Sequence, residues 1–354
     1  MILVAVFLLI ALGFLFLASA SSDLGKVRFD NAYYYIWRQI IYGASVGLVG
    51  FFLALKIPYK NLKPYTFYLL IASVGLVALT FTPLGIVLGG ARRWLQFGPF
   101  VFQPAEILKF TFIMYLAAWL SSERKNRSKS FYNGFLPFIV LSGTIGGLLL
   151  LQRSTSAVLI TMLSALCVYF ISGAKWRYIL AVFGLGALVL PLVIYFTPYR
   201  LERVLTFLDP AQDTSGASYQ IDRAKVTIGS GGFLGVGYGN SVTKQYLPER
   251  IGDSIFAIIA EEFGFVGASS LILLYSVLVL RGLMVAKNIG EPFGRLLLAG
   301  ISIIIGLQAF THIGAISGVI PLTGVPLPFI SYGGTALAVF MIAAGLMLNV
   351  TKRG

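Results

Sequence analysis

Charged residues are scarce in this sequence, and their scarcity sets the class of protein. Asp, Glu, Lys and Arg together make up 11% of the 354 residues, whereas hydrophobic residues make up 58%. A soluble domain carries roughly a quarter charged residues. The composition therefore excludes an ordinary soluble protein and predicts a polytopic integral membrane protein. Its expected fold class is all-α, because long apolar runs cross a bilayer as helices.

Cysteine and histidine are also rare, since each occurs once, as Cys167 and His312. One cysteine cannot form a disulfide within the chain, and one histidine without cysteine partners does not make a zinc site, so no metal ligand is assigned. Acidic residues number 13 against 27 Lys and Arg. Beside a bilayer this cationic excess indicates contact with anionic lipid headgroups, and no nucleic-acid partner is expected.

Ten apolar runs have about 18 or more residues, the length that a transmembrane helix needs. The first run has no cation before Lys26, so we interpret it as a membrane helix rather than a signal peptide. A polar, glycine-rich connection, 198–252, separates the seventh run from the eighth. We expect a single membrane domain over 1–354 with ten transmembrane helices, at approximately 2–19, 38–56, 65–83, 104–121, 132–151, 155–173, 177–197, 254–280, 295–316 and 334–350.

Lys and Arg are distributed unequally between the two sets of loops. Fourteen of them lie in the short loops and the C-terminal tail on one side, and six lie in the short loops on the other side. Cytoplasmic loops carry the larger number. We therefore expect both termini in the cytoplasm, with the large loop 198–252 and the segments 90–110 and 318–334 outside.

The large loop contains the glycine-rich stretch IGSGGFLGVGYGN, at 228–240. It does not follow a predicted strand in a βαβ unit, which a dinucleotide-binding fingerprint requires. Glycine mainly permits unusual backbone angles, so a flexible or closely packed re-entrant loop is one interpretation. The other interpretation is that backbone N–H groups of this stretch bind a pyrophosphate oxygen.

Six cations of the outer segments are candidates for binding a diphosphate. Arginine suits this role because its planar fork matches phosphate oxygens, although attraction to lipid headgroups explains the same charges. The candidates are Arg92, Arg93, Arg203, Arg223, Lys244 and Arg250.

Glu106 and Lys109 are three residues apart and follow Pro104, a favourable first residue for a helix. They are expected on one face of a helix inside a membrane span. Ionisable residues in such a place usually pair, so a neutralising ion pair is one interpretation. A functional pair that shapes a cavity beneath the outer loops is the other, and both can hold at once.

Asp253 lies immediately before the eighth apolar run, in the stretch PERIGDSIFAIIAEEFGF (248–265). Its position favours a helix cap, because Asp-Ser before an apolar run is an N-cap signal. Capping explains neither Glu261 nor Glu262, which lie deeper in the run and are further candidate residues. A carboxylate beside a cationic loop also suits a general base toward a hydroxyl nucleophile. Ser331 lacks the sequence context of a hydrolase nucleophile.

Four stretches carry a resemblance to a known family: ARRWLQFGPFVFQPAEILKF (91–110), AKVTIGSGGFLGVGYGNS (224–241), LPERIGDSIFAIIAEEFGFVG (247–267) and GVIPLTGVPLPFISYGG (318–334). With these stretches and its ten expected spans, the chain resembles the SEDS proteins of shape, elongation, division and sporulation, the family that contains RodA, FtsW and SpoVE. The residue sequences of the glycine-rich stretch and of LPER are more similar to the elongation branch, RodA, than to the division branch.

The resemblance implies a peptidoglycan glycosyltransferase that polymerises lipid II at the outer face of the bacterial cytoplasmic membrane, for cell elongation and rod shape. It implies that Asp253 is the family's essential acidic residue, with a catalytic role, and that Glu106 and Lys109 are the family's intramembrane pair. The expected partners are lipid II, membrane lipid and a class B penicillin-binding protein. No cofactor is expected, while a divalent cation at the diphosphate stays open.

The chain also departs from the family pattern. Many relatives have a QPDLGT-type stretch with a carboxylate where this chain has LLQRSTSAVL (150–159), with Arg153 and Ser154. His312 stands near a position where relatives tend to have Asn. The competing function is a flippase that carries lipid II across the bilayer, although we see no internal repeat of the kind that transporters show. A scaffold that only recruits a penicillin-binding protein is a third hypothesis.

Overall fold

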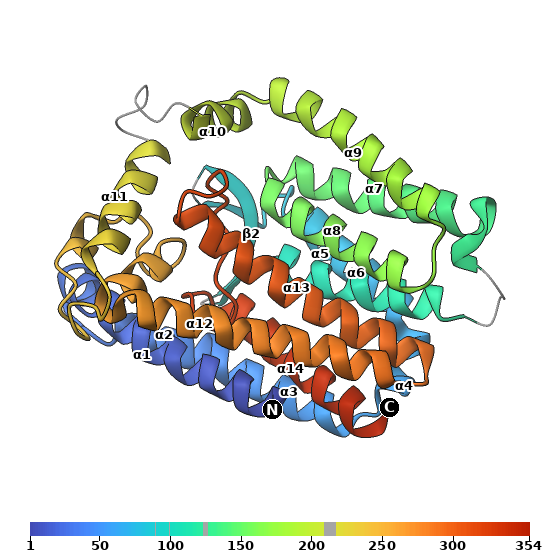
Figure 1. The fold of residues 1–354 in the computed structure, drawn as a ribbon, viewed down its shortest axis with the longest axis horizontal. Helices are drawn as coiled ribbons and strands as arrows, with labels where there is room; N and C mark the ends of the chain where they lie inside the picture. Colours follow the sequence, from blue (N-terminus) through green and yellow to red (C-terminus); the bar gives the residue numbers. More distant parts are fainter. Residues whose placement is uncertain (89, 99, 123–126, 209–216) are drawn as a thin grey trace.

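The computed structural model describes residues 1–354 except 89, 99, 123–126 and 209–216, and it is built mainly from helices (Figure 1). Residues 123–126 belong to ERKNRSK (123–129), one of the short loops whose cations indicate the cytoplasmic side, and they lie outside the described residues. A π-helical turn over Ile40–Ala44 joins the second and third helices. The helices are α1 (Ile2–Phe29), α2 (Tyr34–Gln39), α3 (Ser45–Lys56), α4 (Tyr59–Leu62), α5 (Thr66–Leu79), α6 (Pro104–Leu120), α7 (Leu136–Leu151), α8 (Thr155–Ile171), α9 (Trp176–Tyr195), α10 (Pro198–Leu208), α11 (Ala217–Ser230), α12 (Ile255–Asn288), α13 (Pro292–Ile316) and α14 (Gly334–Arg353).

Each of the ten apolar runs lies on a helix, and the protein is a multi-pass membrane protein. Within the described ranges, eight helical stretches are long and apolar enough to cross a membrane. The two remaining expected spans, 104–121 and 155–173, form the 17-residue helices α6 and α8. They fall just short of the span length because one starts at Pro104 and the other ends at Ile171.

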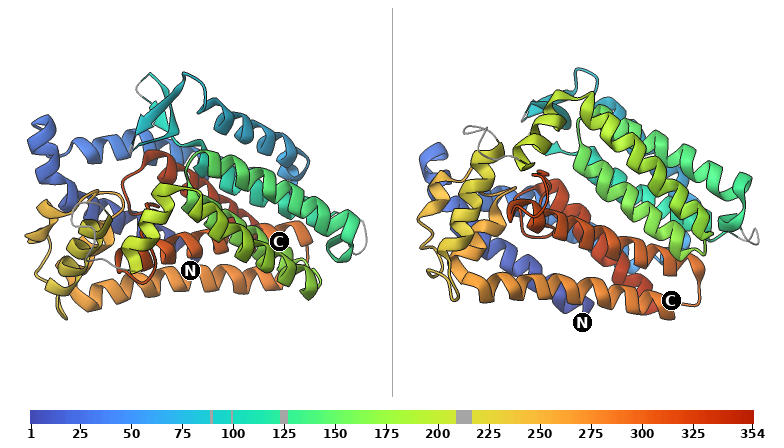
Figure 2. Two further views of the ribbon diagram at one scale, coloured as in Figure 1. Left: turned by 90° about the horizontal axis from the view of Figure 1, so that it is seen from above. Right: turned by 45° about the horizontal axis from the view of Figure 1, so that its top comes forward.

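The helices form a bundle around α13, which packs against α6, α8 and α12. In the most apolar stretch of α13, 83% of the stretch is buried inside the protein, whereas in that of α9 only 11% is buried. Figure 1 shows α9 along one edge of the bundle and α1 along the opposite edge, and the right view of Figure 2 agrees. In a membrane, the exposed apolar side chains of α9 therefore face lipid or a partner rather than water.

A small antiparallel sheet corrects the expectation of an all-α fold. Its strands are β1 (Gly85–Leu88), β2 (Ala91–Phe97) and β3 (Phe100–Phe102), paired in the order β1-β2-β3. Gly90 and Gly98 follow β1 and β2 with φ angles of 74° and 58°, which tight turns between strands require. These turn glycines between short aromatic and β-branched runs are signals of a sheet, which the expectation of an outer segment at 90–110 does not include.

The large connection between α9 and α12 is partly helical, because it contains α10, α11 and a 3₁₀ turn at Thr243–Tyr246. Its glycine-rich stretch packs onto a break in α12 at Gly264, where φ is 64° and ψ is −162°. Backbone N–H groups of Val236 and Gly237 donate to the carbonyls of Glu261 and Glu262, both at 3.0 Å. These N–H groups therefore hold the helix break, which supports the packed-loop interpretation over pyrophosphate binding.

Glycine is required at this contact because two backbones approach each other closely. A Cβ atom at Gly264 would lie 2.3 Å from the backbone nitrogen of Gly235, and one at Gly235 would lie 2.2 Å from the carbonyl oxygen of Glu262. Backbone atoms cannot move aside as the end of a flexible side chain can. The glycine pattern of this stretch therefore reflects steric demand.

We expect Gly264→Ala to lower the melting temperature of the detergent-solubilised protein markedly. The left-handed φ and the close approach to Gly235 together should destabilise the fold by at least about 2 kcal/mol. Gly75→Ala is the matched control, because nothing lies within 4 Å of a Cβ built at Gly75 in α5. Equal melting temperatures for the two variants would show that the break in α12 tolerates a side chain.

Candidate functional site

Asp253 lies one residue before the N-terminal cap of α12. The cap position is Ser254, which makes no side-chain capping hydrogen bond; instead its hydroxyl donates to the carbonyl of Pro248 at 2.8 Å. The structure therefore does not use Asp253 as the cap residue, which was the simpler interpretation of its position. The Asp253 carboxyl group is left to interact with the segments around it.

Two arginines from separate elements lie near the Asp253 carboxyl group. Burial and, to a smaller extent, the charge of Glu249 raise the pKa of this carboxyl from 3.8 to about 6, against the lowering effect of Arg203 and Arg93. Arg203 comes from α10 and Arg93 comes from β2. A carboxyl group with a pKa near neutrality, beside two cations, has the properties of a general base for a reaction on an anionic substrate.

The sheet separates the two neighbouring arginines that were predicted together. The register between β1 and β2 shifts at this point, because Ile86 pairs with Trp94 and Val87 pairs with Arg92, which leaves Arg93 without a partner in the ladder. Arg93 donates to the carbonyl of Gln152 at 3.1 Å and to that of Arg153 at 2.5 Å, whereas Arg92 is exposed. Of this pair, only Arg93 is therefore directed toward the loops that surround Asp253.

Arginines bind the turn after α7, in the stretch 150–159. Arg200 donates to the carbonyl of Leu150 at 3.1 Å and to the hydroxyl of Thr155 at 2.8 Å. Together with Arg93, it satisfies carbonyls at the C-terminal end of α7, where the helix dipole favours positive charge. Main-chain carbonyls thus supply negative partners for these arginines near Arg153 and Ser154.

One segment of the connection between α13 and α14 lies directly against Asp253. A Cβ atom at Gly324 would lie 3.2 Å from Asp253 Oδ2, and Arg203 donates to the carbonyl of Leu322 at 3.0 Å. The hydroxyl of Ser331 donates to the carbonyl of Gly252 at 2.7 Å. The Ser331 hydroxyl thus stabilises the backbone next to Asp253, which agrees with the exclusion of Ser331 as a nucleophile.

Glu106 and Lys109 form the intramembrane pair that their spacing predicts. Lys109 Nζ lies 2.9 Å from Glu106 Oε1, and the Lys109 side chain is fully buried. Lys109 also donates to the side-chain oxygen of Gln308 on α13, at 2.5 Å. The pair is therefore closed to solvent and joined to a third polar side chain.

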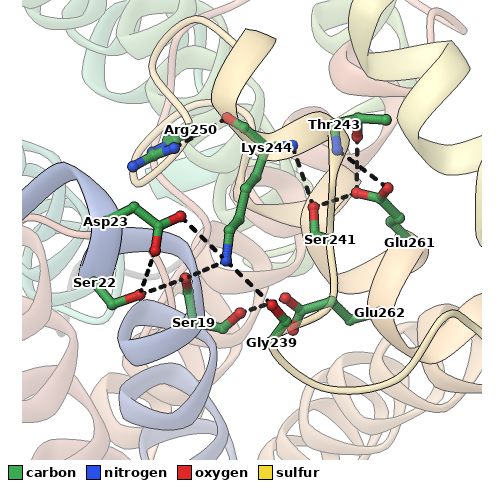
Figure 3. Close-up of polar contacts among 10 residues, drawn as sticks. All are labelled: Ser19, Ser22, Asp23, Gly239, Ser241, Thr243, Lys244, Arg250, Glu261 and Glu262. Atoms are coloured by element: carbon green, nitrogen blue, oxygen red, sulfur yellow. Dashed lines mark hydrogen bonds and ion pairs between the residues drawn. The ribbon is translucent and has the colours of Figure 1, made fainter.

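Lys244, another candidate for diphosphate binding, lies in a second polar cluster, which we call the Lys244 cluster (Figure 3). Its Nζ lies 3.4 Å from Asp23 Oδ2 at the end of α1 and donates to the carbonyls of Ser19 and Gly239. The ammonium group is buried and directed to these partners. The structure therefore does not bring Lys244 together with Asp253.

Glu261 and Glu262 belong to the same Lys244 cluster (Figure 3). Glu261 accepts hydrogen bonds from the hydroxyls of Ser241 and Thr243, the latter at 2.8 Å, and Glu262 accepts one from the hydroxyl of Ser19. Both carboxylates are almost completely buried. They connect α12 to α1 and to the large loop, which accounts for two acidic residues inside an apolar helix.

Arg250 and Arg223, the last two candidate cations, also point elsewhere. Arg250 is buried and donates to the carbonyl of Lys244 at 3.3 Å, and burial lowers the pKa of its guanidinium. Arg223 is exposed and lies over the ring of Tyr219, 5.0 Å from its centroid. Of the six predicted cations, only Arg93 and Arg203 are therefore placed by their charges beside Asp253.

Sequence reasoning missed Gln308, which joins the pair on α6 to the segment beside Asp253. A signal was present, because Gln308 and His312 are four residues apart and share one face of α13. His312 contributes a structural hydrogen bond there, since its Nδ1 lies 2.7 Å from the carbonyl oxygen of Val325. Among the described residues, no group of three or more His, Cys, Asp and Glu could hold a metal ion.

An apolar cavity of about 430 Å³ lies beneath the small sheet. Side chains of α3, α5, α6, α13 and α14 line it, and the strand β3 covers it with Phe100, Val101 and Phe102. Thr335 at the start of α14 accepts a hydrogen bond from the backbone of Gln103 at its rim. The cavity has the shape and surface chemistry for a hydrocarbon chain.

The fold and the site define a multi-pass membrane protein with a partly buried carboxylate near two arginines at one end of its bundle. The chain belongs to the FtsW, RodA and SpoVE family of cell cycle proteins, whose family model matches residues 1–354. It is 36% identical to a probable peptidoglycan glycosyltransferase FtsW from Geobacter sp. (strain M18), over 99% of this chain and 96% of that protein. It is 32% identical to stage V sporulation protein E from Bacillus subtilis (strain 168), with the same two coverages.

Solved structures agree with this family. A chain from a study of how a peptidoglycan synthase complex coordinates polymerization and crosslinking superposes with a TM-score of 0.83 at 30% identity, over 99% of this chain and 96% of that chain. The rod shape determining protein RodA of Thermus thermophilus gives a TM-score of 0.73 at 27% identity, over 99% and 95%. The fold is therefore shared over the whole length of these chains.

The names of the sequence relatives correct the expectation that the chain is most like RodA. The relatives quoted above carry the names FtsW and SpoVE, and RodA appears among the solved structures. The wording of the glycine-rich stretch was the basis for the elongation branch. Because those glycines meet a steric demand at the break in α12, their pattern is a weak guide to the branch.

We expect Asp253→Asn to stabilise the protein at neutral pH but not at pH 4. In the folded state the carboxyl pKa is raised from 3.8 to about 6, so ionisation of Asp253 is unfavourable in the folded protein. The wild type therefore loses stability relative to the variant as the pH rises from about 4 to 6, and the difference is constant above that. Melting temperatures across this range measure the effect.

Asp222→Asn is the control for this series, because Asp222 is exposed on α11. Its melting temperature should follow that of the wild type at every pH. A difference between Asp253→Asn and the wild type that does not change between pH 4 and 7 would show that Asp253 ionises normally.

We expect Lys109→Ala to destabilise the protein more than the double change Glu106→Ala/Lys109→Ala. The single change leaves the buried Glu106 carboxylate unpaired, at a cost of about 3–5 kcal/mol for a well-buried pair. The measurement is the melting temperature in detergent. A single variant as stable as the wild type would show that the contact between Glu106 and Lys109 contributes nothing.

Proposed function

We propose that this protein is a peptidoglycan glycosyltransferase that polymerises lipid II at the extracytoplasmic end of its bundle. The observation that carries the proposal is the Asp253 carboxyl group, with a pKa of about 6, beside Arg203 and Arg93. The relatives named peptidoglycan glycosyltransferase support the same reaction. In this orientation both termini are cytoplasmic and α10, α11 and the small sheet lie outside the bacterial cytoplasmic membrane.

The reaction joins two lipid-linked disaccharides. The 4-hydroxyl oxygen of the acceptor N-acetylglucosamine attacks the anomeric carbon of the donor N-acetylmuramic acid and forms the new glycosidic bond. The bond from that carbon to the phosphate oxygen breaks, and undecaprenyl diphosphate leaves with the electron pair. Asp253 accepts the hydroxyl proton, which a group with a pKa near the working pH does efficiently. The α-linked donor becomes a β-1,4 linkage, so the configuration inverts.

Arg203 and Arg93 offset the negative charge that develops on the diphosphate as it leaves. Both lie close enough to lower the pKa of Asp253, so they act on the same small region as the base. Positive groups fixed before the reaction stabilise a developing charge without reorganisation. The apolar cavity beneath the sheet is a suitable place for part of an isoprenoid chain.

A class B penicillin-binding protein is the proposed partner, because the similar chain of known structure belongs to a peptidoglycan synthase complex. The partner would crosslink the strands that this chain polymerises. The process served, division or elongation, then depends on which penicillin-binding protein it binds. Copurification with each candidate partner would identify that process.

The test is the purified protein, with and without the penicillin-binding protein, given lipid II in detergent. Glycan strands on a gel support the enzyme, and Asp253→Asn should abolish them while the protein remains folded. The rate should rise with pH through about 6 and then level off, because Asp253 must be ionised to accept a proton. Transfer of lipid II across liposomes without strand formation would instead indicate a flippase.

We expect Arg203→Ala to lower kcat by at least about tenfold, with a smaller change in KM, because only interactions that strengthen in the transition state change the chemical rate. Arg223→Ala is the matched control, since Arg223 lies in the same loop but is exposed over Tyr219. It should retain a rate within about twofold of the wild type, roughly 0.4 kcal/mol. Equal losses in the two variants would mean that the loop acts through its overall charge.

A further inference from the structure

The ion pair on α6 has a third polar partner, Gln308 on α13. Lys109 donates to Gln308 Oε1 at 2.5 Å as well as to Glu106 Oε1 at 2.9 Å. An ammonium group has only donors, so it can bind only the oxygen of the Gln308 amide. That contact turns the amide nitrogen the other way, and Gln308 Nε2 donates to the carbonyl of Pro326 at 2.9 Å. Lys109 thus sets the direction of the Gln308 donor.

The backbone around Pro326 is held by two more buried side chains in the same manner. Nδ1 of His312 lies 2.7 Å from the carbonyl oxygen of Val325, and the hydroxyl of Tyr275 donates to the carbonyl of Pro328. Proline has no backbone N–H group, so its carbonyl oxygen is the only backbone polar group it can offer. We call residues 322–328 the proline segment; its carbonyls are bound from α12 and α13.

The proline segment forms a wall of the Asp253 site. Gly324 lies against the Asp253 carboxyl group, and the carbonyl of Leu322 accepts the hydrogen bond from Arg203. The carbonyl of Thr323 accepts a hydrogen bond from Ser156 at 2.5 Å. A shift of Pro326 would therefore move the two residues that contact the base and one of its cations.

We propose that Gln308 is a positioning residue of the Asp253 site and that Glu106 and Lys109 act on the site through it. The Lys109 side chain is fully buried, so in this state it acts through its protein partners rather than by direct contact with substrate. Gln308 joins the pair to the proline segment, because its amide contacts both Lys109 and the carbonyl of Pro326. This inference rests on the proposed function for its kinetic readout.

The sharpest variant is Gln308→Glu. The new carboxylate keeps oxygen atoms for Lys109 and nearly the same shape, but when ionised it cannot donate to the carbonyl of Pro326. With lipid II at pH 7.5, kcat should fall by about 10- to 100-fold, the effect of a misplacement of about 1 Å, while KM stays near that of the wild type. Wild-type kcat in this variant would overturn the proposal.

Asn349→Asp is the matched control for damage to a buried amide. The Asn349 amide nitrogen donates to the carbonyls of Ala54, Leu55 and Ile57, so it also holds backbone from a buried helix. Its side-chain oxygen accepts a hydrogen bond from the backbone of Tyr59, so the hydrogen bonds of Asn349 lie at the end of α3 and the start of α4 rather than in the proline segment. A fall in kcat as large as that of Gln308→Glu would show that general destabilisation explains both.

A double-mutant comparison tests whether the pair acts through Gln308. Glu106→Gln/Lys109→Met removes the pair without leaving an unpaired charge. Adding Gln308→Met to this background should lower kcat by less than about twofold, because residues that act in one chain of contacts are not additive. A further tenfold loss would show that the pair and Gln308 act independently.

Hydrogen–deuterium exchange supplies a readout that does not depend on catalysis. The backbone N–H groups of Leu327, Ile330 and Ser331 are hydrogen-bonded within this connection, and their exchange should be faster in Gln308→Glu. If the wild type forms no glycan strands, the proposed function fails while this measurement still decides the positioning role. Unchanged exchange at these residues would overturn that role.

Discussion

Hydrogen bonds from buried side chains to the carbonyls of the proline segment are the interaction on which the Asp253 site depends. In a membrane interior, an unpaired backbone carbonyl is costly, and prolines leave their segment with few groups of its own to satisfy others. Gln308, His312 and Tyr275 supply donors from two helices of the bundle. Irregular backbone can therefore lie inside the protein, against a carboxyl group that the burial itself makes more basic.

The polar residues at the end of the bundle that carries Asp253 form two groups with different roles. Around Asp253, the cations come from β2 and α10, and the charges are arranged about a carboxyl group with an altered pKa. Around Lys244, a buried ammonium is matched by Asp23 and by carbonyls of α1 and the glycine-rich stretch. The group around Lys244 fixes the position of the large loop against α1 and α12. The group around Asp253 is available for the proposed reaction.

The membrane-spanning helices could be predicted from the sequence because they are long apolar runs. The contact between Glu106 and Lys109 could be predicted because the two residues are three apart on one helix. Which of the six candidate cations lie beside Asp253 could not be predicted. Their positions depend on contacts between distant parts of the chain, such as that of Lys244 with Ser19, 225 residues apart. The small sheet was missed because its strands are short and lie in what reads as a loop. Gln308 was missed because its spacing from His312 marks a polar face of α13 but does not show which distant residues that face contacts.

The spacing of the buried charges bears on the order in which the chain is synthesised and inserted. Lys109 enters the membrane 199 residues before Gln308 is made, but Glu106 precedes it by one turn, so the charge is neutralised on its own helix. Glu261 and Glu262 have no such local cation, yet Ser19, Ser241 and Lys244 are all translated earlier. Lys109, Lys244, Glu261 and Glu262 thus each emerge from the ribosome when a partner already exists.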